Sequence, residues 1–177
     1  MEKIELETER LILRQLVEND AEEMFKNWAN DDDVSRYVRW TTHKNVEETK
    51  EYIRTEQERC KNDNYYNWGI VLKEKNELIG AIGAFPSEDE RLEIGYNIAK
   101  KHWRNGYTTE ALKRVMDYLI NEKGVDRFRC CHAILNPASG AVMKKVGFKY
   151  VYDSVSEKFD KSVKYDTKVY YLDIDKN

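Results

Sequence analysis

Residues 101–111 combine the residue types that can bind a phosphate group. The segment reads Lys-His-Trp-Arg-Asn-Gly-Tyr-Thr-Thr-Glu-Ala and lies between a predicted strand and a strongly amphipathic predicted helix. The first amides of a helix lack helical acceptors and carry the positive end of its dipole, so such a junction can bind an anion. Gly106 lets the backbone approach a ligand closely, and Arg104 could add a charged contact. Taken alone, the segment also fits an ordinary loop leading into a helix.

The elements that must position this segment follow from the hydrophobic pattern. Strands are predicted over residues 10–17, 66–73, 77–85, 92–98, 127–135, 148–155 and 163–173. Helices are predicted from Asn19 or Asp20 onward, over residues 46–60 and 110–123, and after Asn136 as far as Gly147.

The helix predicted over residues 110–123 has the clearest pattern. Its apolar residues recur in pairs every four positions and form one stripe: Ala111, Leu112, Val115, Met116, Leu119 and Ile120. Gly124 provides a stop signal. In the following helix, Asn136 is the predicted N-cap and Pro137 takes the first position.

The order strand, helix, strand, helix over residues 92–147 requires a parallel strand pair joined by a crossover helix. The neighbouring strands read as antiparallel hairpins. We therefore expect an α+β fold: a mixed, mostly antiparallel sheet with helices on both faces, forming a single domain over residues 1–177.

Composition narrows the function classes. The formal net charge is −3, which gives no sign of a nucleic-acid-binding surface. The longest apolar run, residues 79–85, is too short to cross a bilayer, and no signal peptide is visible at the N-terminus. Three cysteines and three scattered histidines indicate reduced thiols, a cytoplasmic location and no metal site.

Several segments together resemble the GNAT N-acetyltransferases, and more narrowly the group of ribosomal-protein alanine N-acetyltransferases. The matching segments are residues 8–14, 93–96, 103–111, 136–139 and 142–148, in the family's order. The group's loop commonly reads Trp-Gly-x-Gly-Tyr-Ala-Thr-Glu-Ala. This chain departs from it at Arg104 and Thr108, which keep the backbone donors but narrow the space for a diphosphate.

The resemblance implies acetyl-CoA as co-substrate and one parallel strand pair that splays apart. Backbone groups of six consecutive residues are implied to bind the diphosphate: Arg104, Asn105, Gly106, Tyr107, Thr108 and Thr109. Ile98 is implied to bind the pantetheine and face the thioester carbonyl, and Asn136 and Ser139 to contact CoA. For Asn136, a plain helix cap is an equally good interpretation, and both roles can coexist.

The predicted reaction is acetyl transfer to a primary amine, which must lose a proton before it attacks. Glu93 is our candidate base, directly or through water; the alternative is a partly buried, ion-paired strand glutamate. Many GNAT enzymes place a tyrosine that protonates the CoA thiolate where this chain has Met143, so Ser139 is the candidate acid, with solvent as the alternative.

The acceptor remains open between a protein N-terminus and a small-molecule amine. Aromatic residues and the acidic runs 31–33 and 88–90 would suit a cationic amine, but core packing and solvated turns are the better explanation for each residue taken singly. A second hypothesis is a catalytically weak acyl-CoA-binding regulator. An unrelated nucleotide-binding domain is disfavoured, because no Gly-Lys-Ser/Thr follows Gly106. An exposed final strand could pair two copies into a homodimer.

Overall fold

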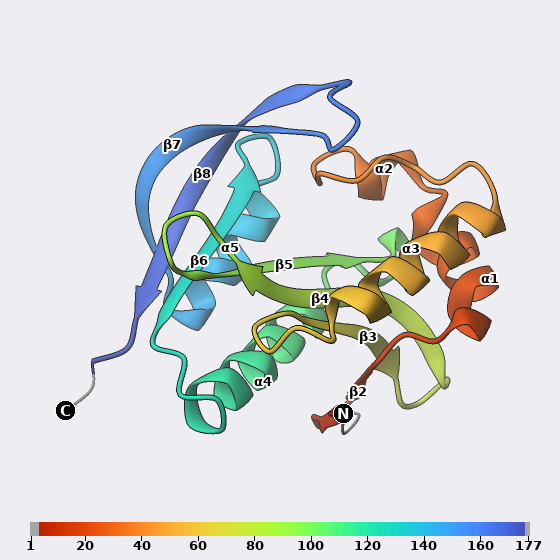
Figure 1. The fold of residues 1–177 in the computed structure, drawn as a ribbon, viewed down its shortest axis with the longest axis horizontal. Coiled ribbons are helices and arrows are strands. Elements are labelled where there is room, and N and C mark those ends of the chain that lie inside the picture. Colours follow the sequence, from red (N-terminus) through yellow and green to blue (C-terminus); the bar gives the residue numbers. More distant parts are fainter. Residues whose placement is uncertain (1–3, 176–177) are drawn as a thin grey trace.

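A computed structural model describes residues 4–175 and contains one eight-stranded sheet (Figure 1). The strand order is β1-β2-β3-β4-β5-β6-β8-β7, and every described pairing is antiparallel except β5 with β6. The strands are β1 (Leu6–Glu7), β2 (Leu11–Arg14), β3 (Tyr66–Leu72), β4 (Glu77–Pro86), β5 (Leu92–Ile98), β6 (Arg127–Ala133), β7 (Lys149–Glu157) and β8 (Lys164–Asp173). The predicted mixed, mostly antiparallel sheet is confirmed.

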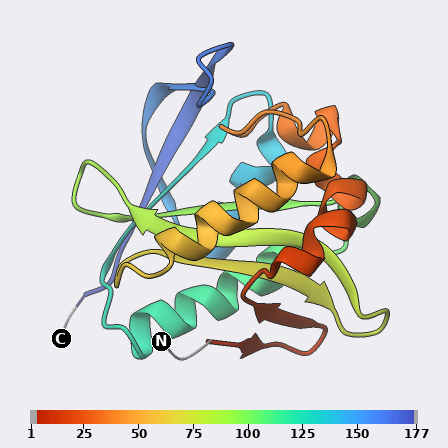
Figure 2. The ribbon, with the colours of Figure 1, turned by 45° about the vertical axis from the view of Figure 1, so that its right-hand side comes forward.

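Helices cover both faces of the sheet, as expected (Figures 1 and 2). They are α1 (Ala21–Met24), α2 (Asp32–Ser35), α3 (Val46–Arg59), α4 (Tyr107–Asn121) and α5 (Pro137–Val146), with short helical turns η1 (Glu18–Asp20), η2 (Phe25–Ala29) and η3 (Lys100–His102). The apolar stripe of α4 packs on one face of the sheet, and residues of α1 and α3 form a second core on the other. Each face is therefore closed by its own core.

The helix predicted from Asn19 or Asp20 is present over residues 18–29, but its pitch changes along its length. It divides into η1, α1 and η2, and η2 is a π-helix in which Asn30 N donates to Phe25 O at 3.1 Å. The wider turn accompanies full burial of Trp28. The 3.6-residue spacing of apolar residues does not predict such a change of helical pitch.

Helix α4 begins at Tyr107, one turn before the predicted start. Its first turn contains Thr108 and Thr109, which carry no apolar periodicity and so read as loop in the sequence. The polar segment 101–111 thus supplies both the loop and the beginning of the helix. This brings the unpaired amides of the helix directly to the candidate phosphate loop.

The parallel pair β5–β6 separates part of the way along. Pairing covers only residues 92–94 of β5 and 128–130 of β6, although β5 continues to Ile98 and β6 to Ala133. Figure 1 shows the two strands running in different directions beyond this point. We call the gap between residues 95–98 and 131–133 the wedge. It confirms the splayed pair that the family resemblance implied.

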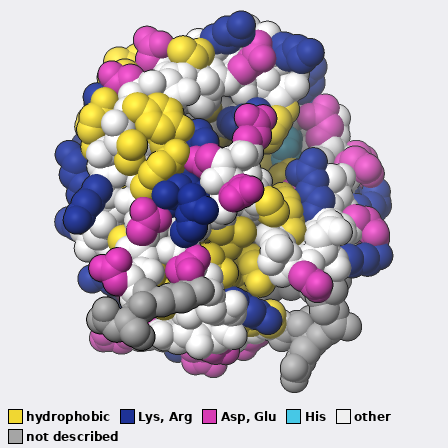
Figure 3. All heavy atoms as spheres, turned by 60° about the vertical axis from the view of Figure 1, so that its left-hand side comes forward, with side chains coloured by type: hydrophobic (Ala, Val, Ile, Leu, Met, Phe, Trp, Pro, Cys, Tyr) yellow, Lys and Arg dark blue, Asp and Glu magenta, His cyan; other side chains and the backbone are white. Residues whose placement is uncertain are grey.

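The expectation of an exposed final strand is wrong. The last strand, β8, lies between β6 and β7, so the edge strand at this end of the sheet is β7. Exposed apolar side chains on β7 include Tyr150, Val151 and Val155. Figure 3, which turns the β7 side forward, shows hydrophobic patches among charged side chains. A homodimer stays a prediction.

Among the helices that the structure describes, none combines the length and apolar character needed to span a membrane.

Candidate functional site

The loop before α4 has the backbone that an anion site requires. The main chain is left-handed at Arg104 (φ 64°) and at Gly106 (φ 78°), and residues 103–106 are exposed. Helical hydrogen bonding begins with Glu110 N donating to Gly106 O at 3.1 Å. The amides of Tyr107, Thr108 and Thr109 therefore precede the first helical bond, and residues 4–175 supply no acceptor for them.

Side chains fix the loop in place. The Trp103 indole Nε1 donates to Ile98 O at 2.8 Å, and the Asn105 amide donates to His102 O and Trp103 O at 3.0 and 3.1 Å. The Asn105 side chain is thus occupied within the loop, and its backbone remains for the predicted contact with the diphosphate.

Arg10 is a residue that sequence reasoning left without a role. Its guanidinium donates to Asn105 O at 3.0 Å, pairs with Glu110 at 2.7 Å and lies 4.4 Å from the centre of the Tyr107 ring. Glu110 also accepts from Thr8 Oγ1 at 2.6 Å and Arg10 N at 2.9 Å. Partial burial acts against ionisation, but these bonds lower the pKa of Glu110 below its ordinary value. The segment 8–14 is thus joined to the start of α4.

The end of β5 turns main-chain groups toward the wedge. Ala99 N donates to Ile79 O at 2.7 Å. Gly80 and Ile98, which lie opposite each other on β4 and β5, therefore form a non-hydrogen-bonded pair of the ladder. Polar backbone groups of Ile98, and of Tyr96 two residues earlier, therefore face away from β4, on the side that β6 has left. The Ile98 carbonyl is taken by Trp103. Its amide is the group that suits the implied contact with CoA.

Glu93 lies on the opposite face of β5 from the α4 core. Its carboxylate pairs with Arg129 Nε at 3.3 Å and accepts from Cys131 Sγ at 3.5 Å. The side chain is 18% exposed, so the partly buried, ion-paired description fits it. Such a carboxylate can still accept a proton from an amine that reaches its exposed portion, and the geometry leaves that role possible.

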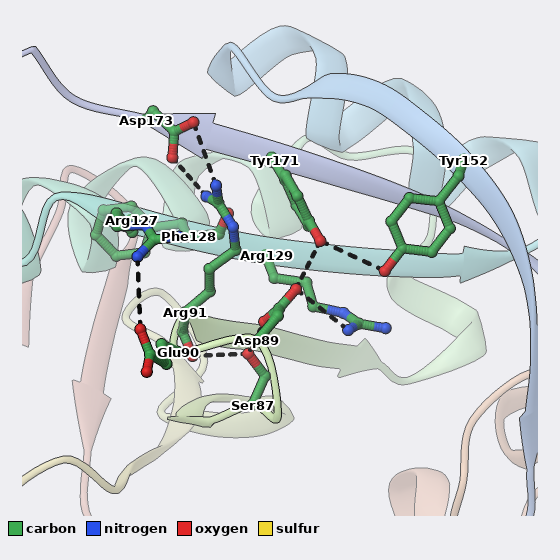
Figure 4. A network of polar contacts seen from close by, with 10 residues as sticks. All are labelled: Ser87, Asp89, Glu90, Arg91, Arg127, Phe128, Arg129, Tyr152, Tyr171 and Asp173. Carbon is green, nitrogen blue, oxygen red and sulfur yellow. Dashed lines mark hydrogen bonds and ion pairs between the residues drawn. The ribbon is translucent and has the colours of Figure 1, made fainter.

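The acidic turn 87–91 is more than a solvated connection. Asp89 Oδ2 accepts from Tyr171 Oη at 2.6 Å and lies 3.5 Å from Arg129, and Ser87 also donates to Asp89 (Figure 4). Partial burial opposes ionisation, but these contacts lower the pKa of Asp89. The run 31–33 also differs from a plain turn, because Asp31 caps α2 by accepting from Asp33 N at 2.9 Å.

Ser139 is paired with Tyr96, a second residue to which sequence reasoning gave no role. Ser139 Oγ donates to Tyr96 Oη at 3.1 Å, and Tyr96 Oη donates to Ser139 O at 3.0 Å. Burial raises the pKa of Tyr96 well above its ordinary value. Strand alternation could have found this residue, because Tyr96 must point to the face opposite Glu93, toward α5.

Asn136 stands at the N-cap of α5, but its side chain makes no capping hydrogen bond. The predicted cap is therefore correct in position and wrong in its bond. Nearby, Gly140 lies against the buried His132 ring, where an added Cβ would come within 2.5 Å of Nε2. Met143 is 1% exposed and belongs to the core.

The early aromatic residues contribute mainly to packing. Trp28 and Trp68 are buried, and Trp40 is partly buried against the second core, where His43 makes ring contacts with Trp40 and Tyr52. Above them, Lys158 of the β7–β8 connection is buried and donates to backbone carbonyls of residues 35, 38 and 40. Its burial lowers its pKa. The hairpin is thereby tied to the segment after α2.

Comparison with known proteins places the chain among the acetyltransferases that its sequence resembles. Residues 10–149 match the family described as acetyltransferase (GNAT) domain. A relative in Bacillus subtilis (strain 168), the uncharacterized N-acetyltransferase YoaA, is 35% identical over 169 residues, which cover 94% of this chain and 95% of that protein.

Solved structures share the fold. A putative ribosomal-protein-serine acetyltransferase from Vibrio cholerae superposes with a TM-score of 0.84 at 18% identity, covering 97% of this chain and 98% of that one. RimL, a ribosomal L7/L12 alpha-N-protein acetyltransferase in complex with coenzyme A, gives 0.81 at 18% identity, covering 99% and 100%.

Proposed function

The chain belongs to the GNAT acetyltransferase family, and from this premise we propose that it transfers acetyl from acetyl-CoA to a primary amine by direct attack on the thioester. The observation that carries the proposal is the set of unpaired amides at Tyr107, Thr108 and Thr109, next to a strand pair that opens into a wedge. A diphosphate needs the first feature, and a pantetheine arm that hydrogen-bonds to a strand needs the second.

In the proposed binding mode, backbone groups of residues 104–109 hold the diphosphate. The Ile98 amide bonds to the pantetheine end and aims a donor at the thioester oxygen, where negative charge develops during attack. Asn136 fits a contact with CoA because its side chain is not engaged in capping the helix. Lys144 and Lys145 are exposed on the same helix and are available to a phosphate.

Glu93 acts as the base in this proposal, directly or through water. A lysine-like amine is neutral in roughly one molecule per few thousand at pH 7, and an α-amine in roughly one in ten. The amine nitrogen forms the new amide bond, its excess proton passes to Glu93, and the carbon–sulfur bond breaks. A side-chain amine therefore depends on Glu93 far more than a peptide N-terminus does.

The departing thiolate takes a proton from water, or from the Ser139 hydroxyl, which regains a proton from solvent. The Tyr96 hydroxyl of β5 is the hydrogen-bond partner of Ser139, and this contact supports a role for the pair. A thiol pKa near 8.5 means that little help is needed near pH 7. Ser139→Ala is thus expected to slow turnover by a smaller factor than loss of Glu93.

A glutamine at position 93 tests the chemical part of the proposal. Glu93→Gln should lower kcat/KM for spermidine about 100-fold or more, and for the peptides by much less, while leaving acetyl-CoA affinity unchanged, because the amide cannot accept the proton. CoA release is measured with four acceptors: an alanine-initiated peptide, a serine-initiated peptide, spermidine and glucosamine. Glu90→Gln is the matched control, since Glu90 is 89% exposed on the adjacent turn.

Two results would redirect the proposal. Equal rates for Glu93→Gln and the unmodified chain would remove Glu93 as the base. Acetyl-CoA binding without turnover of any amine would favour the catalytically weak acyl-CoA-binding regulator, which the buried Met143 in place of a tyrosine also suits.

A further inference from the structure

We propose that Arg129 is a positioning residue for Glu93: it places a positive charge beside the carboxylate and holds it in one orientation, and the turn 87–91 orients Arg129 in return. The inference rests on the proposed function, in which Glu93 is the base. It adds a residue outside the matching segments, on a strand that contributes no acid–base group of its own to the reaction.

The contacts of Arg129 point to both carboxylates. Nε lies 3.3 Å from Glu93 Oε2, and NH1 lies 3.5 Å from Asp89 Oδ2. The Arg129 and Glu93 side chains are 20% and 18% exposed. Arg129 Nε is fully enclosed and has no hydrogen-bond partner among the described residues, so the ion pair with Glu93 is its compensation. Limited solvent strengthens such a pair relative to one on the surface.

Asp89 is itself held by side chains of the neighbouring strand β8. Tyr171 Oη donates to it, and Arg91 lies 3.8 Å from the centre of the Tyr171 ring while pairing with Asp173 (Figure 4). Figure 4 shows these side chains converging from the turn, β6 and β8. The network reaches Glu93 through Arg129. A guanidinium can bridge two carboxylates because its donors project in fixed directions.

Among the described residues, the other groups near Glu93 are uncharged or paired elsewhere, and Arg129 is its ion-pair partner. Cys131, on β6, donates to Glu93; burial and then the charge of Glu93 raise the pKa of Cys131 to about 12, so it remains a thiol. Tyr165 of β8 also approaches, and burial raises its pKa to about 12. Arg39 lies on the same side and donates to Glu157 O at 3.2 Å. On β4, the residue opposite Glu93 is the uncharged Phe85.

The test follows the titration of Glu93 itself, which needs no acceptor. In protein labelled with ¹³C at glutamate carboxyls, the Glu93 resonance is assigned by its loss in Glu93→Gln. Arg129→Gln should raise the pH midpoint of this resonance, since the variant removes a cation that favours the ionised form. Arg129→Lys, which keeps the charge and is the milder change for folding, should give a smaller rise.

Arg127→Gln is the control, because Arg127 lies on the same strand, is 49% exposed and pairs with Glu90 at 3.9 Å rather than with Glu93. It should leave the Glu93 midpoint unchanged. An unchanged midpoint in folded Arg129→Gln, or an equal rise in Arg127→Gln, would overturn the inference. Neither outcome touches the role of Glu93 as base, which the rate of Glu93→Gln decides separately.

Discussion

Gly106 and Arg104 both adopt a left-handed backbone conformation, which glycine tolerates and arginine does not favour. Both have φ between 60° and 80°, where a residue with a Cβ is strained by about 1–2 kcal/mol. The related group commonly has glycine at the position of Arg104. A left-handed backbone explains that preference, so this chain carries the strain in exchange for a cationic side chain beside the loop.

Replacing Gly106 with valine should abolish acetyl-CoA binding. The added side chain strains the backbone and fills the space through which a diphosphate approaches. It does not clash with the rest of the protein, because Arg10 at 3.5 Å is the only described neighbour within 4 Å of the new Cβ. Isothermal titration with acetyl-CoA measures the loss.

Gly124→Val is the matched control. Gly124 has φ 68° and nothing within 4 Å of an added Cβ, so the backbone strain is similar but lies beyond the other end of α4. The control should bind acetyl-CoA normally. Equal affinity in both variants would mean that the loop is structural only.

Single residues were predictable where motif and alternation agreed. Strand alternation correctly places Glu93 away from the α4 core, whereas the catalytic roles assigned to Glu93 and Ser139 stay predictions. Arg10 and Arg129 were not predictable, because their partners Glu110 and Glu93 lie 100 and 36 positions away. Such pairs depend on strand order, which local pattern does not contain.

Among the elements, α4 is anchored at its first turn by Glu110. The bonds from Thr8 and Arg10 stabilise the ionised carboxylate, so the pKa of Glu110 is lowered in the folded chain. This stabilisation is present above the ordinary glutamate pKa of about 4.3 and is lost as pH falls through the lower folded pKa.

Glu110→Gln should therefore reduce the free energy of unfolding by about 1–3 kcal/mol at pH 7 and by less below pH 4. Urea unfolding at both pH values measures the difference. Glu122→Gln, at the exposed opposite end of the helix, should change stability by no more than about 0.5 kcal/mol. A loss for Glu110→Gln that does not shrink at low pH would contradict the assigned ionisation.

The sequence predicted the long elements better than their ends. The stripe of α4 and the hairpin β3–β4 appear where alternation and helical period are strong. The start of α4 was missed because polar residues fill its first turn, and the π turn at Phe25–Ala29 was missed because apolar spacing does not record pitch. The capping hydrogen bond predicted for the Asn136 side chain is absent, because a residue type favoured at the N-cap position does not always form that bond.

At the scale of the molecule, the wedge exists because β6 leaves β5 after three pairs and continues along β8 instead. In the proposed function, the α4 side of the sheet serves the coenzyme, and the other side, with Glu93, serves the acceptor. The splayed parallel pair was implied by the family resemblance. The inner position of β8 was not foreseen, since the sequence does not show which strand of the last hairpin meets β6.

Ligand binding across several elements should protect the whole chain against heat. At acetyl-CoA concentrations 100-fold above the Kd, linkage adds about 2.7 kcal/mol, or a rise in Tm of roughly 5–10 °C for a domain of this size. Differential scanning fluorimetry measures the rise, and adenosine without a diphosphate is the control. An unchanged Tm at millimolar acetyl-CoA would reject the coenzyme assignment.

The most direct measurement is an amide ¹H–¹⁵N titration of the labelled chain with acetyl-CoA. The account predicts that the amides of Tyr107, Thr108 and Thr109 move most, together with that of Ile98, while the amide of Gly124 stays in place. Saturable binding that leaves these four amides unperturbed, or no binding at all, would contradict it.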